Sequence, residues 1–145
     1  MSGQPAGAFN LLSISVEDAS AINPPNIIGL GDSFTITVEF KGNPADQTFG
    51  GTWTAIRNLA QPYQIIVYAE AIGGGYEGIL ARTTGNLVVG QDAYSVNLPV
   101  TNGVLPGGTT LGNGLYLVGA TVQIPSFPQW VGYVQDTFVQ VATGA

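Results

Sequence analysis

The sequence contains no cysteine and no histidine, and it has few charged residues. The absence of Cys and His excludes disulfide scaffolds, thiol chemistry, zinc fingers and catalysis by histidine. Only Lys41, Arg57 and Arg82 are positive, and with 9 acidic residues the formal net charge is -6 at pH 7. Nucleic acids and anionic membrane surfaces bind proteins mainly through Lys and Arg. We therefore expect neither of them as a partner.

The low charge density says something about the surface. Charged residues make up 8% of the chain, against about 25% in a typical soluble domain. Much of the surface must therefore consist of Gly, Thr, Asn, Gln and apolar groups. Such a surface favours coverage by partner proteins, or an extracellular module solvated by hydroxyl and amide groups. An ordinary acidic domain of low charge density is a further alternative.

Long apolar runs are also missing. No run approaches the roughly 18 residues of a membrane-spanning helix, so we expect no membrane insertion. Residues 1–9 have neither a basic region nor an apolar core of the kind found in signal peptides. The length of 145 residues corresponds to one domain. We expect a flexible N-terminal arm over 1–8, a single domain over 9–142 and a short tail over 143–145.

The residues that are present favour strands over helices. In residues 33–41, Phe34, Ile36, Val38 and Phe40 alternate with polar side chains, which predicts a half-buried strand. Turn-forming residues delimit further predicted strands at 9–16, 63–71, 77–82, 85–90, 94–100, 114–124 and 133–141. The nearly all-apolar strand 63–71 is typical of a strand covered on both faces. Residues 52–56 are either a strand or part of the long connection from 42 to 62.

Seven or eight short antiparallel strands predict an all-β sandwich or barrel. Gly31-Asp32-Ser33 leading into an alternating strand, followed by the strand 63–71, resembles strands B and C of an immunoglobulin-like or fibronectin-III-like β-sandwich. The strand 114–124 resembles strand F, with Tyr116 placed as in a tyrosine corner, and residues 133–141 resemble strand G. The sequence has no Cys pair and no Trp on the strand C equivalent, which excludes an antibody-type domain. A resemblance at this level implies a fold and no activity.

Two groups of acidic residues are candidates for chemistry. Glu70 and Glu77 flank the hairpin turn Gly73-Gly74-Gly75, where paired carboxylates could act as in a glycosidase. The alternative is two solvent-facing residues beside a turn. Calcium binds clustered carboxylates, and the candidates are the acidic residues Glu17, Asp18, Asp32, Asp92 and Asp136. They lack the spacing of a calcium-binding loop, and single loop acids usually cap turns. We expect no metal, no cofactor and no enzymatic activity.

Three aromatic residues are the candidate binding residues. Trp53 lies in the connection 42–62, and Phe127 and Trp130 lie in the segment 124–130, where two prolines stiffen the chain. Exposed aromatic rings can contact a partner protein or stack on a sugar; alternatively, both Trp rings fold back and cap the core ends. We expect a non-enzymatic structural or interaction protein, a repeated subunit or decoration module of a virion, tail, filament or surface layer. Its partners are then copies of itself or other assembly subunits, on a particle or an extracellular surface. The alternative is an extracellular adhesion or carbohydrate-binding module, for which a glycan is the ligand.

Overall fold

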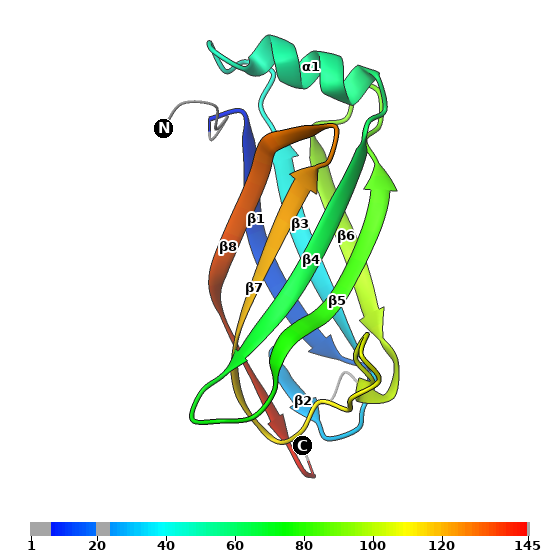
Figure 1. Cartoon of the computed structure of the whole chain (residues 1–145), viewed down its shortest axis with the longest axis vertical. Helices are drawn as coiled ribbons and strands as arrows, with labels where there is room; N and C mark the ends of the chain where they lie inside the picture. The colour runs from blue at the N-terminus through cyan, green and yellow to red at the C-terminus, as the bar shows by residue number, and fades with distance from the viewer. Residues whose placement is uncertain (1–6, 20–23, 145) are drawn as a thin grey trace.

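Two β-sheets pack face to face, and one short helix covers an end of the stack (Figure 1). The structure is a computed structural model that describes residues 7–19 and 24–144. Over these residues the elements are β1 (Phe9–Asp18), β2 (Ile27–Gly29), β3 (Phe34–Gly42), α1 (Gly50–Asn58), β4 (Pro62–Ala71), β5 (Glu77–Asn86), β6 (Ala93–Val100), η1 (Thr101–Gly103), β7 (Gly114–Ile124) and β8 (Phe127–Ala142).

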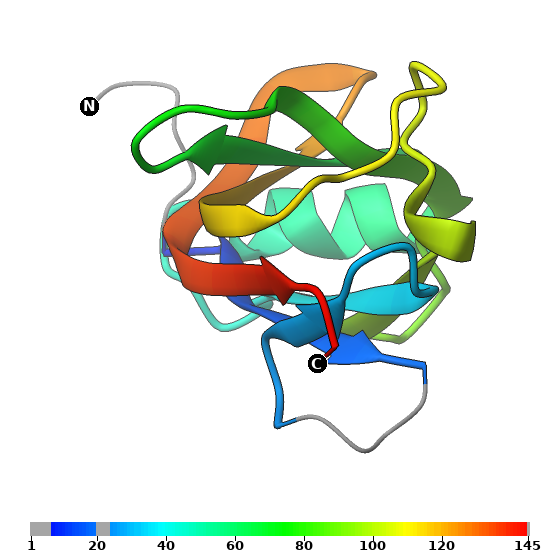
Figure 2. The same ribbon diagram turned by 90° about the horizontal axis from the view of Figure 1, so that it is seen from below.

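The strand order is that of an immunoglobulin-like sandwich. One sheet has three strands in the order β1-β3-β6, and the other has five in the order β2-β8-β7-β4-β5. Pairing is antiparallel except between β2 and β8, which are parallel. In Figure 1 the five-stranded sheet lies in front with β1, β3 and β6 behind it, and Figure 2 shows the two layers from the end opposite α1. The predicted fold class is confirmed.

The core lies between the two sheets and follows the alternation in the sequence. Phe34, Ile36, Val38 and Phe40 of β3 are at most 2% exposed, as their spacing predicts. Tyr116 of β7 donates a hydrogen bond from its hydroxyl to the carbonyl oxygen of Gly112, at 2.7 Å. This is the geometry of a tyrosine corner, so that prediction is also confirmed.

The two long sides of the sandwich differ. On one side β1 approaches β8 so closely that a Cβ at Gly132 would be 2.8 Å from the backbone nitrogen of Leu11. Only glycine fits this approach without displacing backbone. On the other side β5 and β6 are edge strands of their sheets, and a groove of about 470 Å³ opens beside them.

Three local predictions are corrected by the structure. Residues 50–58 form the helix α1, with Gly50, Trp53 and Ile56 buried along one face. Its 9 residues are too few to cross a membrane, and no other helix in the described ranges is longer. Residues 85–90 are not a separate strand, because β5 runs on to Asn86 and a turn follows. The segment 124–130 is a tight hairpin in which Ile124 pairs with Phe127.

The N-terminal arm is described only at its end. Residues 1–6 lie outside the described residues. Ala8 is buried, and its carbonyl oxygen accepts a hydrogen bond from the backbone N–H of Asn43 at 2.7 Å. The chain is therefore fixed to the sandwich from Ala8 onward.

Candidate functional site

The two tryptophans lie inside the core rather than on the surface. Trp53 on α1 is 0% exposed, and Trp130 on β8 is 2% exposed. Their rings stack with centroids 6.2 Å apart. Gly42 of β3 lies against the Trp53 indole, where any Cβ would overlap the ring. Of the two alternatives left open by the sequence, exposure of both rings is wrong, and capping of an end of the core describes the structure.

Phe127 differs from the two tryptophans. It begins β8 and is half-buried, packed against the core while part of its ring remains accessible. The assignment of Trp53, Phe127 and Trp130 as contact residues stays a prediction. A partner could touch Phe127 directly, but it could reach the two indoles only if the α1 end opened.

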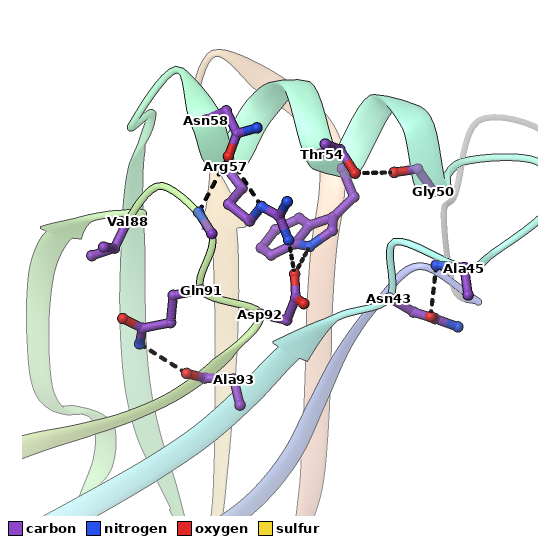
Figure 3. Close-up of polar contacts among 12 residues, drawn as sticks. Asn43, Ala45, Gly50, Thr54, Arg57, Asn58, Val88, Gln91, Asp92 and Ala93 are labelled. Atoms are coloured by element: carbon purple, nitrogen blue, oxygen red, sulfur yellow. Dashed lines mark hydrogen bonds and ion pairs between the residues drawn. The ribbon is translucent and has the colours of Figure 1, made fainter.

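Polar contacts hold α1 on the end of the sandwich (Figure 3). Asp92, just before β6, accepts hydrogen bonds at Oδ1 from the indole N–H of Trp53, at 2.8 Å, and from the Arg57 guanidinium. Asn58 accepts a hydrogen bond from the backbone N–H of Gly90 at 3.2 Å. Desolvation raises the pKa of Asp92, but the two hydrogen bonds and the charge of Arg57 outweigh it, so the pKa lies below its ordinary value. These contacts are structural.

The candidate calcium ligands do not form one cluster, although Asp18 and Asp32 lie within hydrogen-bonding reach of each other. Asp18 is buried and accepts a hydrogen bond at Oδ2 from the backbone N–H of Gly29, at 2.8 Å. A hydrogen bond with Asp18 raises the pKa of Asp32, and burial and the charge of Asp18 raise it further. Asp92 lies at the opposite, α1 end, and the side chain of Asp136 is outside the described part. Within that part, no three His, Cys, Asp or Glu residues form a group that could hold a metal ion.

Glu70 and Glu77 face each other directly across β4 and β5. Both side chains are exposed on the outer face of the five-stranded sheet. They therefore occupy the solvent-facing positions beside a hairpin turn, and the pair forms part of a larger surface.

That outer face carries apolar and aromatic side chains where solvent-facing polar residues would be expected. We call it the apolar sheet face, and its members are Ile66 and Tyr68 on β4, Leu115 and Leu117 on β7, and Val131, Tyr133 and Phe138 on β8. Tyr133 is 58% exposed, Phe138 54%, Leu115 42% and Val131 37%. Figure 1 views the molecule onto this sheet. Several large exposed apolar side chains on one sheet face are typical of an interaction site.

Two tyrosines form the centre of the apolar sheet face. The rings of Tyr68 and Tyr133 stack with centroids 6.4 Å apart and an angle of 23° between planes. Tyr68 lies over Gly119, where a Cβ would be 2.8 Å from the ring. Burial raises the pKa of Tyr68, and a hydrogen bond with Tyr133 raises it further. The glycine thus lets the Tyr68 ring lie flat on the sheet.

Among the described side chains of this face, the charged ones lie on β4 and β5. Arg82 pairs in register with Ile66, and Glu77 pairs with Glu70. All three charged residues are exposed. The face therefore has a positive group towards the α1 end and two negative groups towards the hairpin turn.

The groove between β5 and β6 is separate from the apolar sheet face. Its lining is mainly apolar, contributed by Leu80, Ala81, Pro99, Val100, Thr101, Val104, Leu105 and Pro106, with Arg82 beside them. Arg82 is the one titratable residue of this lining. The groove therefore offers no acid–base pair for catalysis.

Sequence reasoning missed the apolar sheet face, although one signal for it was present. The strand 63–71 is nearly all apolar, and in a two-layer sandwich only one face of a strand meets the core. The other face of such a strand must then be covered by a partner or stay exposed.

Comparison with known proteins places the fold in a class. No family model and no curated protein matches the chain. Solved structures with immunoglobulin-like domains do match, at identities that show the fold alone.

The C-terminal domain of Wzt matches with a TM-score of 0.59 and 10% identity, over 95% of this chain and 75% of that one. The CARDB domain of the PF1109 protein from Pyrococcus furiosus, solved in complex with di-metal ions, matches with a TM-score of 0.49 and 13% identity, over 93% and 90%. A β-glucosidase from Listeria innocua matches with a TM-score of 0.47 and 16% identity; 90% of this chain corresponds to 16% of that enzyme. The chain is an immunoglobulin-like β-sandwich domain.

Proposed function

We propose that the chain is a non-enzymatic interaction module that binds other protein subunits through the apolar sheet face. The observation that carries this proposal is the exposure of Tyr133 and Phe138, 58% and 54%, on the same regular sheet. Aromatic side chains on a rigid scaffold bury a large apolar area with little loss of conformational entropy when they dock. A subunit or decoration module of a virion, tail, filament or surface layer uses a surface of this kind.

The charge distribution supports a protein partner. β7, the middle strand of the sheet, contains no charged residue, so a partner can cover it without burying an unpaired charge of that strand. Charged groups at the rim, such as Arg82 and Glu77, suit a protein interface with an apolar centre and a polar periphery.

Mutation of the face tests the proposal. Mass is measured by light scattering after size exclusion across a range of concentrations, with negative-stain microscopy of the same fractions. We expect wild-type chains to associate, alone or with co-expressed neighbouring subunits, and Tyr133→Ser and Phe138→Ser to weaken that association by roughly tenfold or more. Val89→Ser is the matched control, because Val89 is 66% exposed in a turn outside the face.

The outcome that contradicts the proposal is equally specific. If both face variants associate as strongly as wild type and keep their urea unfolding midpoints, the apolar sheet face is not part of the interface. An equal loss in Val89→Ser would point to general surface hydrophobicity instead of this face.

A glycan-binding module is the second candidate, and the stacked pair of Tyr68 and Tyr133 favours it. Two tyrosine rings at an angle of 23° form a flat platform of the type on which sugar rings stack. The test is titration with soluble oligosaccharides, monitored by tyrosine resonances. Sugar binding requires Tyr133 and tolerates Phe138→Ser, whereas protein association requires both.

A further inference from the structure

We infer that the partner of the apolar sheet face is a second copy of this chain, related by a two-fold axis that crosses the strands at Tyr68 and pairs Arg82 of each copy with Glu77 of the other. The inference rests on the proposed function, because it concerns the same face. It adds which residues of one copy lie opposite which residues of the other.

The strand pairing puts the residues of the face into rows. The row of Ile66 contains Arg82 on β5, Thr121 on β7 and Tyr133 on β8. The next row contains Tyr68, with Ile79 on β5 and Gly119 on β7. The third row runs from Glu77 through Glu70 and Leu117 to Phe138.

The row of Tyr68 lies midway between the other two. Same-face residues of β4 are about 7 Å apart, so Ile66 and Glu70 lie at nearly equal distances on either side of Tyr68. On β5 a register shift puts Arg82 three residues from Ile79 and Glu77 two, so both charges still lie in the flanking rows. A two-fold axis along this row turns the strands of the second copy antiparallel to those of the first. It places the Ile66 row of one copy against the Glu70 row of the other.

This operation pairs opposite charges on β5, while Glu70 on β4 faces Ile66 of the second copy beside that contact. Arg82 meets Glu77 of the second copy, and Glu77 meets Arg82, so the contact forms twice by symmetry. At the opposite edge of the sheet, Tyr133 meets Phe138 of the second copy, also twice. Opposite charges and aromatic rings are therefore brought together by one axis.

The other in-plane axis, parallel to the strands, gives no such match. It would place β5 of one copy over β8 of the other, so that Arg82 and Glu77 would face Tyr133 and Phe138. Glu77 would then lose solvent against Phe138 and Glu70 against Leu117, so neither acid would meet a cation, which is unfavourable.

The shape of the centre permits the approach. Tyr68 lies on the axis row and would meet its own symmetry copy. Because its ring lies flat over Gly119, it does not hold the sheets apart, and sheets pack face to face at about 10 Å.

Charge reversal tests the register. Sedimentation equilibrium is measured for wild type, Arg82→Glu, Glu77→Arg and an equimolar mixture of the two variants. Each single variant places like charges in both symmetric contacts, and we expect its dimer dissociation constant to rise roughly tenfold or more. In mixed pairs every contact again joins opposite charges, so the mixture forms a heterodimer of near wild-type affinity.

Lys41→Glu is the matched control, since it makes the same charge change at an exposed position of the three-stranded sheet. It should leave the dimer unchanged. Urea unfolding of each variant verifies that the fold is intact.

The results separate this inference from the proposed function. Weakened single variants with recovery in the mixture support both. Association abolished by Phe138→Ser but insensitive to Arg82→Glu overturns the two-fold register and leaves the face as an interface. A chain that stays monomeric up to its solubility limit overturns self-pairing, and the face is then available only to a different protein.

Discussion

The Asp92 carboxylate joins the loop before β6 to the helix that covers the end of the sandwich, and its removal is a sharp test of how this end is stabilised. In Asp92→Ala the indole N–H of Trp53, at 0% exposure, loses its 2.8 Å acceptor. An unsatisfied buried donor costs about 1–3 kcal/mol. Arg57, whose side chain is 13% exposed, loses its carboxylate partner as well. We expect a total loss of about 3 kcal/mol.

A loss of this size lowers the unfolding temperature by about 10 °C in a domain of this length. Asp92→Asn keeps a carbonyl oxygen that can accept from the indole N–H, so we expect a smaller loss, about 1 kcal/mol. Glu17→Ala, which removes an exposed acid from β1, is the control and should stay within about 0.5 kcal/mol of wild type. Urea unfolding followed by far-UV circular dichroism gives the values. If Asp92→Ala costs no more than Glu17→Ala, the reasoning from burial of the indole donor is refuted.

Three further outcomes are expected. Tyr116→Phe removes the hydroxyl that donates to Gly112 and should cost about 1 kcal/mol, measured by urea unfolding. The folded-state pKa of Asp92 lies below its ordinary value of 3.8. Its charged form therefore stabilises the fold above that value, and this stabilisation is lost as the pH falls through the folded pKa. The difference in unfolding free energy between wild type and Asp92→Asn should therefore shrink under acid. Since Trp53 and Trp130 are at most 2% exposed, acrylamide should quench their fluorescence far less than that of the urea-unfolded chain, and quenching of equal efficiency would contradict their burial.

The fold was largely predictable because its signals are local. Alternation in 33–41 fixes which side of β3 is buried, and the bounds predicted for 114–124 are those of β7. The helix α1 was not predictable in this way. It has 9 residues and two large buried side chains, Trp53 and Ile56, and a period of 3.6 residues is not readable over so short a span.

The site was harder to predict because exposure is a tertiary property. Trp53 lies in a connecting segment by sequence, yet α1 turns its ring onto the core, where the missing side chain of Gly42 makes room. Tyr133 belongs to a predicted strand, and its exposure follows from the register of β8 on β7 and from the absence of a covering layer within the described residues. No local sequence pattern predicts the burial of Trp53 or the exposure of Tyr133.

The parallel course of the first and last long strands has a mechanical consequence. β1 starts at the α1 end, and β8 finishes at the opposite end with β2 beside it (Figure 1). A tension applied between Phe9 and Ala142 therefore acts along the strands, while the hydrogen bonds of the ladders lie across them. The bonds are loaded together in shear instead of being opened one at a time. Pulled from these two points, the domain should resist force better than when it is pulled at the β4–β5 turn, where the hairpin peels apart bond by bond.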